Sequence, residues 1–403
     1  MKEIYIAAYH QSEFGKLMGM TVPGIVQAAV EGACGEIGVP ASELGTASIG
    51  AACGFTLNGQ GLLAGLVADV EGMAGKPIEA VENACASGGQ AVLSVIQKLQ
   101  LGVADTGIAI GYEKMRGPDG KMDGKLIGEV LGYFSHPEDR EGKTFVFPHI
   151  FAEVMRDYMV EHGATEADLA AIAVQEYANA RLNPKAQMRK ASVTLEQALK
   201  VEGINRYVVD GLPLKTYDCS QITDGYASLI LATDEGLARL GVKRQDAVEV
   251  AGWGQATDPL TRTGRDVLRP AGAYKAMNAA YAMAGLRSAD VNVAEVHDCF
   301  TVMGAIGTEV IGKAVPGQGA KYWVDGKAAP DGECGINTSG GLIAKGHPVG
   351  ATGVAMIGWA AMQLLGRVPE GLQVAAPSVA ATFNIGGPIC ASVCTVLRAG
   401  CGG

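Results

Sequence analysis

The chain passes from an apolar, strand-like run into a helical pattern at Val81-Glu82-Asn83-Ala84-Cys85-Ala86-Ser87-Gly88-Gly89, and the helix is predicted over Gln90 to Leu101. A cysteine at such a sharp turn faces the backbone N–H groups of the next helix, whose dipole favours a thiolate. We therefore predict that Cys85 is a nucleophile. The competing interpretation is an unreactive cysteine that is buried beneath the helix as a small apolar residue.

An approximate internal repeat relates the two ends of the chain. Each copy has a helical stretch, a short polar connection and an apolar strand. The first copy comprises residues 22–37, 41–44 and a strand ending at Cys53, and the second comprises 272–285, 288–291 and a strand ending at Cys299. Aligning Cys85 with His347 also aligns Gly88 with Gly350. The repeat predicts an α/β fold of two duplicated halves, whose strand ends and helix N-termini surround one shared crevice.

The repeat also divides the chain into domains. Residues 1–115 and 223–245 form the predicted N-terminal half, and residues 246–403 form the C-terminal half. Residues 116–222 have no counterpart and form an inserted domain, with predicted helices over 150–162 and 166–182. The insertion carries a basic cluster that is either a solvated helix face or a phosphate-binding surface in an acidic chain. This cluster consists of Arg181, Lys185, Arg189 and Lys190.

The composition is typical of a large soluble protein of the cytoplasm. The 403 residues are 48% hydrophobic, and neither a signal peptide nor a long uninterrupted apolar span is evident. The net charge of -10 argues against nucleic-acid binding. Nine cysteines, without the spacing of a disulfide framework, are expected to be reduced thiols. Cys390 and Cys394 fit a buried strand better than a zinc site, so we expect no metal.

Three further segments place reactive or flexible groups at predicted strand ends. His297-Asp298-Cys299-Phe300 closes a strand at the mouth of the sheet, although a histidine satisfied by the adjacent carboxylate is the alternative. A Gly-rich loop places His347 before a helix that keeps it neutral, so one nitrogen can donate to an oxyanion while the other activates a thiol. Gly386 and Gly387 let a backbone N–H approach a substrate, or form a tight turn only.

At these segments the chain resembles the thiolase superfamily over essentially its whole length. The nucleophile motif is Cys85-Ala86-Ser87, and the histidine motif is Gly346-His347-Pro348. Where many thiolases have Asn-Glu-Ala-Phe and Cys-x-Gly, this chain has His297-Asp298-Cys299-Phe300 and Asn384-Ile385-Gly386, as in the sterol-carrier-protein-type and archaeal-like branch. The resemblance implies the thiolase fold, a five-layer αβαβα sandwich in which the insertion is a loop domain that covers coenzyme A.

The resemblance also implies a mechanism. Cys85, activated by His347, becomes acylated by a 3-oxoacyl-CoA, and free coenzyme A then takes the acyl group; the same residues run the reverse Claisen condensation. His347 and a water held by His297 stabilise the enolate, and Cys299 supplies the proton. The N–H groups of Cys85 and of Gly386 or Gly387 form the second oxyanion site. Coenzyme A is thus a substrate, and no cofactor is implied.

Some members of the superfamily also resemble this chain over Met1 to Ser12 and Val81 to Gln90, and this narrower resemblance implies an acyl substrate. Members that match there cleave 2-benzoylsuccinyl-CoA into benzoyl-CoA and succinyl-CoA in anaerobic toluene degradation, which requires a phenyl pocket and a cation. We expect Phe147 and His149 to bind substrate, together with Arg181 and Lys185. Three basic residues that flank this aromatic stretch are either the cation or, as charges of this kind more often are, solvent-facing: Arg140, Lys143 and Arg156.

Partners and alternatives complete the expectations. The branch implies a thiolase homodimer that acts with a small zinc-ribbon and OB-fold protein, and the acidic net charge favours a basic partner. The alternative enzymes are an acetoacetyl-CoA thiolase and a synthase of related fold, either a decarboxylating ketoacyl synthase or a hydroxymethylglutaryl-CoA synthase. The non-enzymatic alternative is a thiolase-like scaffold or lipid-binding subunit.

Overall fold

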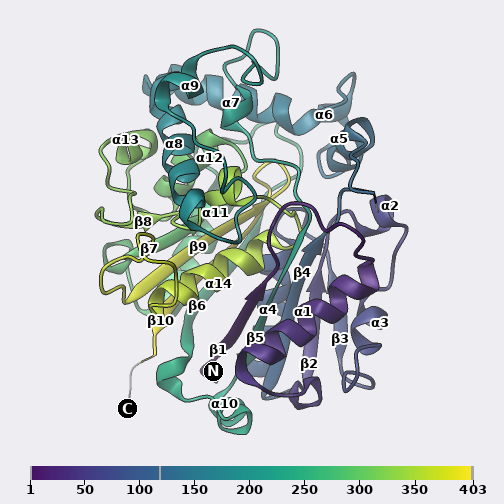
Figure 1. Cartoon of the computed structure of the whole chain (residues 1–403). Helices are drawn as coiled ribbons and strands as arrows, with labels where there is room; N and C mark the ends of the chain where they lie inside the picture. Colours follow the sequence, from purple (N-terminus) through teal and green to yellow (C-terminus); the bar gives the residue numbers. More distant parts are fainter. Residues whose placement is uncertain (1, 118, 401–403) are drawn as a thin grey trace.

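A computed structural model describes residues 2–117 and 119–400, and these residues form a ten-stranded sheet. The strand order is β3-β2-β4-β5-β1-β6-β10-β9-β7-β8 (Figure 1). The strands span β1 Tyr5–Gln11, β2 Thr46–Gly50, β3 Ile78–Val81, β4 Thr106–Glu113, β5 Gly225–Ala232, β6 Val248–Thr257, β7 Val293–Val296, β8 Gly335–Ile336, β9 Val379–Gly386 and β10 Ala391–Ala399.

The two halves of this sheet repeat one another. The order 3-2-4-5-1 in the first half returns as 8-7-9-10-6 in the second. In each half a central strand, β2 or β7, runs parallel to both of its neighbours. The halves meet where β1 pairs antiparallel with β6, at Tyr5 with Glu249 and Ile6 with Val248. The predicted duplication is confirmed, and the two half-sheets are hydrogen-bonded into one.

Helices cover the half-sheets in layers. The main helices span α1 Val22–Ile37, α4 Ser87–Gln100, α10 Asp234–Leu240, α11 Ala271–Ala284, α12 Thr301–Val310 and α14 Thr352–Leu364. One apolar core joins α1 and α10 to the outer face of the first half-sheet, and another joins α11 and α12 to the outer face of the second. A third core surrounds α4 and α14 and includes strand residues from both halves. These three cores give the five layers that the resemblance implies.

Local sequence explains where these helices begin and end. The Thr21 side chain accepts a hydrogen bond from the Gly24 N–H at the start of α1, and Gly38, at φ +69°, ends the helix in the left-handed conformation. The connections that follow α1 and α11 are both 3₁₀ turns, η1 Ala41–Glu43 and η4 Ser288–Asp290. The repeated polar connections therefore have the same structure in both halves.

The segment between β4 and β5 supplies the helices that lie above one end of the sheet (Figure 1). They are α5 Gly124–Gly132, α6 Pro137–Arg140, α7 Val146–His162, α8 Glu166–Leu182 and α9 Leu195–Leu199, followed by the 3₁₀ turn η2 Thr216–Asp218. Helix α7 begins four residues before its predicted start, because the aromatic stretch 145–149 is helical from Val146 onward. The exact domain boundaries at 115, 222 and 245 stay a prediction.

The remaining elements are short. They are α2 Gly54–Asn58, α3 Leu63–Ala68, α13 Gly319–Val324, the 3₁₀ turn η3 Arg244–Asp246 and the π-helical turn η5 Gly341–Lys345. The eight described cysteines are unpaired, and the ninth, Cys401, lies outside the described residues. Among the described helices, none is long and apolar enough to cross a membrane.

Candidate active site

Cys85 lies in a constrained turn between β3 and α4. Ala84, just before it, has φ +48°, a left-handed conformation that costs a non-glycine residue free energy. The turn is closed by Ser87, whose hydroxyl accepts from the Asn83 N–H (2.9 Å) and donates to the Ala84 carbonyl (2.6 Å). The predicted strand-to-helix turn is confirmed, and its hydrogen bonds fix where the sulfur points.

The predicted turns of the two halves converge. The Cys85 sulfur and one ring nitrogen each of His297 and His347 lie within 4.8 Å of one another. The two imidazoles meet edge to face, with centroids 5.0 Å apart and planes at 88°. The backbones beneath them also touch, since a Cβ on Gly88 would lie 2.5 Å from the Gly350 carbonyl oxygen. The three groups also have a spacing that suits a metal ion; the absence of a metal stays a prediction.

His347 is held through one ring nitrogen. Its Nδ1 lies 2.7 Å from the Thr352 hydroxyl, and its backbone N–H donates to Thr223 Oγ1 (2.9 Å). Burial, with the nearby Lys345 ammonium, lowers the imidazole pKa to about 3, so the ring is neutral as predicted. The expectation that its two nitrogens would serve two reacting groups is wrong, because Thr352 occupies Nδ1 and leaves Nε2 alone.

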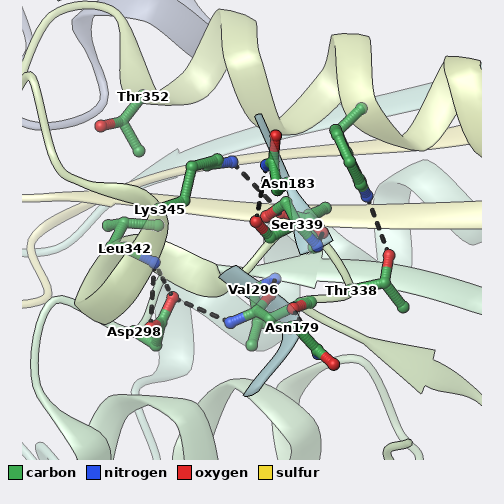
Figure 2. A network of polar contacts seen from close by, with 12 residues as sticks. Asn179, Asn183, Val296, Asp298, Thr338, Ser339, Leu342, Lys345 and Thr352 are labelled. Atoms are coloured by element: carbon green, nitrogen blue, oxygen red, sulfur yellow. Dashed lines mark hydrogen bonds and ion pairs between the residues drawn. The ribbon is translucent and has the colours of Figure 1, made fainter. Parts of the chain in front are cut away.

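His297 is held by an amide and not by the adjacent carboxylate. Its Nδ1 lies 3.0 Å from Asn384 Nδ2, and burial together with His347 lowers the pKa of the ring well below its usual value. Asp298 turns the other way, toward the backbone N–H group of Leu342 (2.9 Å; Figure 2) and that of Ile343 (3.2 Å). The carboxylate alternative for His297 is therefore wrong, since Asp298 anchors the loop that leads to His347.

Cys85 is a neutral thiol in the free protein. Burial and the neighbouring Glu113 carboxylate raise its pKa to about 12, against the opposing effect of the Gly387 N–H. Backbone N–H groups at the turn favour the thiolate, but desolvation outweighs their effect, because it exceeds a dipole contribution of about 1 kcal/mol. The sulfur requires a base within reach at the moment of attack.

The remaining predicted residues surround this sulfur. Gly387 lines the same cavity as Cys85, and the backbone N–H groups of Gly387 and of Cys85 itself oppose the rise in the pKa of the thiol. Gly386 packs so closely that a Cβ there would lie 2.1 Å from the Asn83 carbonyl oxygen. Cys299 is buried, and this burial raises its thiol pKa well above the usual value. These positions are the ones that the resemblance assigned to the acid and to the second oxyanion site.

Comparison with known proteins agrees with this geometry. Residues 4–235 match the family "Thiolase, N-terminal domain", and residues 254–399 match "Thiolase C-terminal domain-like". The chain belongs to the thiolase family. It is an acyltransferase that acts on acyl-CoA and coenzyme A.

Individual relatives of this thiolase cover nearly all of it. The acetyl-CoA acetyltransferase of the archaeon Methanothermobacter thermautotrophicus is 33% identical over 96% of this chain and 97% of its own. The benzoylsuccinyl-CoA thiolase subunit BbsB of Thauera aromatica is 30% identical over 96% of this chain and 95% of its own. The solved structure "Ltp2-ChsH2(DUF35) aldolase" shares the fold, with a TM-score of 0.80 and 20% identity over 98% of each chain.

A cavity of about 390 Å³ leads to the thiolase sulfur. Cys85, His297, Cys299, His347 and Gly387 lie on its walls with residues of α5, α7 and the 216–222 segment. Five of the chain's eight phenylalanines line it, and among the described residues no Arg, Lys, Asp or Glu does so: these five are Phe134, Phe145, Phe147, Phe151 and Phe300. Phe151 and Phe300 stack with centroids 4.6 Å apart. The cavity is therefore apolar and aromatic.

The predicted substrate contacts divide into two groups. Phe147 lines the cavity, whereas the His149 imidazole turns to the Phe145 carbonyl (2.9 Å) and is not among the lining residues. Arg181 and Lys185 are exposed on the insertion and do not line the cavity, so their binding of coenzyme A phosphates stays a prediction. The candidate cations for a substrate carboxylate, Arg140, Lys143 and Arg156, are also absent from the lining.

Sequence reasoning missed two residues of the thiolase site. Asn384 stood out in the sequence only as the replacement of a cysteine, yet its amide contacts both His297 and the Cys85 carbonyl. Glu113 accepts hydrogen bonds from the backbone N–H groups of Ala52, Cys53 and Gly350, and burial raises its pKa to about 7. The signal for Glu113 was a carboxylate at the end of an otherwise uncharged, fully buried strand.

Proposed function

We propose that this thiolase catalyses the reversible, coenzyme A-dependent cleavage of a 3-oxoacyl-CoA through an acyl group carried on Cys85. One observation supports the proposal above others: the Cys85 sulfur lies within 4.8 Å of two imidazole nitrogens, and Cys85 lines an apolar cavity together with Gly387. A partly buried thiol, a base and preorganised donors are the groups that acyl transfer requires.

In the first half-reaction His347 accepts the Cys85 proton while the sulfur bonds to the keto carbon of the substrate. The N–H groups of Cys85 and Gly387 stabilise the resulting oxyanion. When the carbonyl re-forms, the bond between the second and third carbons breaks, and its electron pair passes to the thioester as an enolate. His347, now protonated, and a water held by His297 donate to the enolate oxygen, and Cys299 gives its proton to the second carbon.

In the second half-reaction the shorter acyl-CoA leaves and free coenzyme A enters. Its thiol gives its proton to the Cys299 thiolate and attacks the acyl carbon on Cys85. The sulfur of Cys85 departs and takes the proton back from His347, so both thiols and the neutral imidazole return. The reverse sequence is a Claisen condensation, and the concentrations of the acyl-CoA species set the direction.

The preferred acyl group, in this proposal, is bulky, aromatic and uncharged. The five phenylalanine side chains offer burial and ring stacking, whereas the described lining residues include no charged group, so an ionised carboxylate would be unpaired, which is costly in an apolar pocket. 2-Benzoylsuccinyl-CoA, the substrate named for the Thauera aromatica relative, is the second candidate. Its phenyl group fits the lining, but its extra carboxylate finds no cation among the described lining residues.

We expect the specificity constant kcat/KM to follow this preference. The enzyme should cleave 3-oxo-3-phenylpropanoyl-CoA about 10- to 100-fold more efficiently than acetoacetyl-CoA, because burying a phenyl group contributes about 1.5–3 kcal/mol. Steady-state thiolysis of these two substrates and of 2-benzoylsuccinyl-CoA, monitored by loss of the 3-oxoacyl-CoA, measures the order.

Matched variants localise the effect. Phe147→Ala should reduce the preference for the phenyl substrate, whereas Phe55→Ala, at an exposed phenylalanine outside the cavity, should leave it unchanged. Faster cleavage of 2-benzoylsuccinyl-CoA than of the uncharged phenyl substrate would contradict the uncharged-acyl proposal and support the second candidate. Cleavage of none of the three would contradict the function itself.

The assembly proposed for the enzyme is a thiolase homodimer with a small zinc-ribbon and OB-fold subunit in the reducing cytoplasm. Three observations support it: the solved "Ltp2-ChsH2(DUF35) aldolase" of similar fold is named as two components, the net charge is -10, and the described cysteines are unpaired. We expect the partner subunit to co-purify with this chain from the native host. Removing the partner should raise the KM for the 3-oxoacyl-CoA. Full activity and an unchanged KM for the chain purified alone would contradict the partner.

A further inference from the structure

We propose that Asn384 is a positioning residue that fixes His297 as a permanent N–H donor to the cavity, while His347, which faces a hydroxyl, remains free to exchange protons. The two imidazoles would then have separate tasks. Asn384 is buried at the end of β9, beneath the nucleophile turn and beside His297. The inference goes beyond the proposed function, which supplies only its kinetic consequence.

The orientation of the Asn384 amide follows from its contact with Cys85. Its Nδ2 lies 3.1 Å from the Cys85 carbonyl oxygen, which can only accept a hydrogen bond. The flipped amide would place two oxygens against each other, so the NH₂ group must face this carbonyl. The Oδ1 atom lies between α4 and α14, where a Cβ on Gly89 or Gly353 would approach it to 2.7 or 2.3 Å. Glycines at both positions make room for the amide.

The protonation of His297 follows from the same amide. One NH₂ hydrogen goes to the Cys85 carbonyl, and the other points at His297 Nδ1, 3.0 Å away. An NH₂ group cannot accept, so Nδ1 carries no proton, and the neutral ring carries its single proton on Nε2. His297 Nε2 is buried without a hydrogen-bond partner among the described residues, and His297 lines the cavity. An unpaired, buried N–H that lines a cavity suits a developing oxyanion.

His347 has a different kind of partner. The Thr352 hydroxyl, 2.7 Å from its Nδ1, can both donate and accept, and it also lies 3.0 Å from the Pro348 carbonyl. When the hydroxyl donates to Pro348, it accepts from Nδ1–H, and Nε2 is then free to take the Cys85 proton. The structure therefore permits protonation of His347 and opposes any change in the protonation of the His297 ring.

The tautomer can be tested without any activity assay. We expect ¹⁵N-histidine spectra of the wild-type enzyme, with the His297 signals assigned by their loss in His297→Asn, to show Nε2 protonated and Nδ1 unprotonated from about pH 6 to 9. A His297 ring protonated on Nδ1, or doubly protonated in this range, would overturn the proposal. Neither result depends on whether an acyl-Cys85 adduct forms, so this test and that of the proposed function can fail separately.

The kinetic test uses Asn384→Asp. A carboxylate accepts from the ring, so Nδ1 becomes protonated and Nε2 loses its hydrogen. We expect kcat to fall by about 10²- to 10³-fold, the effect of losing one oxyanion donor, while KM changes by less than about threefold. The pH profile of kcat should also gain an ionisation, because a carboxylate partner raises the pKa of an imidazole.

The matched control is Asn205→Asp. Asn205 is a buried asparagine of the insertion whose NH₂ donates to the Ala198 carbonyl (2.9 Å) and to other backbone carbonyls away from the cavity. The Asn205→Asp variant should lower thermal stability without adding an ionisation to the pH profile of kcat. Wild-type kcat in Asn384→Asp would overturn the proposal. If that variant does not fold, Asn384→Ala should show mixed His297 tautomers, and an unaltered Nε2–H tautomer in it would equally overturn the role of Asn384.

Discussion

The Cys85→Ser enzyme is expected to lose coenzyme A-dependent cleavage by about 10⁴-fold or more, as nucleophile replacements do when the remaining site is intact. A serine hydroxyl is far less acidic than a thiol, and the neutral His347 imidazole is a weak base, since burial lowers its pKa to about 3. The ester formed on serine would also return its acyl group to coenzyme A slowly. Initial rates with a 3-oxoacyl-CoA measure the loss.

The control for this variant is Cys34→Ser. Cys34 is also a described free thiol, but it is buried on α1 away from the cavity. Mass spectrometry of the wild-type enzyme, quenched after mixing with substrate alone, should place the acyl group on the peptide that contains Cys85. Undiminished turnover in Cys85→Ser, or an adduct on another cysteine only, would contradict the covalent mechanism.

The His347→Asn enzyme is expected to lose about 10³-fold or more of kcat/KM near neutral pH, because general-base catalysis contributes about 10²- to 10⁴-fold. In the wild-type enzyme, a Cys85 pKa of about 12 and a His347 pKa of about 3 keep both groups neutral across the usual assay range. Neither residue should therefore cause an inflection in the pH profile of kcat/KM between about pH 3 and pH 12.

The variant should behave differently as pH rises. Without the base, only the thiolate of Cys85 attacks, and its fraction increases about tenfold for each pH unit below the thiol pKa. The residual activity of His347→Asn should therefore increase from pH 6 to 10. Ionisation of Cys85 should cause no such increase in the wild-type enzyme. His136→Asn, at a histidine outside the cavity, is the control. A flat profile in His347→Asn would exclude His347 as the base.

The parts of the site that the sequence predicted correctly are set by local pattern. A strand that ends in small residues before a helix places Cys85 at a turn, whatever surrounds it, and the same holds for the segments around His297 and His347. The repeat then predicted that the two turns meet, because duplicated halves bring equivalent strand ends together. Convergence of Cys85 and His347 needed no information beyond the order of these elements.

The sequence-based predictions that were wrong concern properties set by contacts between distant segments of the chain. The acidity of Cys85 is set by its burial and by Glu113, which is contributed by another strand. The direction of Asp298 is set by the N–H groups of Leu342 and Ile343, which lie more than 40 positions along the chain. The candidate cations Arg140, Lys143 and Arg156 flank the aromatic stretch in sequence, yet none of them lines the cavity, which fits the alternative of solvent-facing charges. Sequence spacing cannot report such directions.

The pairing of β1 with β6 limits how this enzyme can move and how it can change. The Val250 N–H donates to the Ile4 carbonyl (2.8 Å) beside that pairing, and α4 packs directly on α14, so the two halves cannot separate without breaking backbone hydrogen bonds and the central core. Any opening that admits a bulky acyl-CoA must therefore occur where α5 and α7 cover the sulfur. Substitutions in these two helices can alter which acyl groups enter while the catalytic floor keeps its geometry.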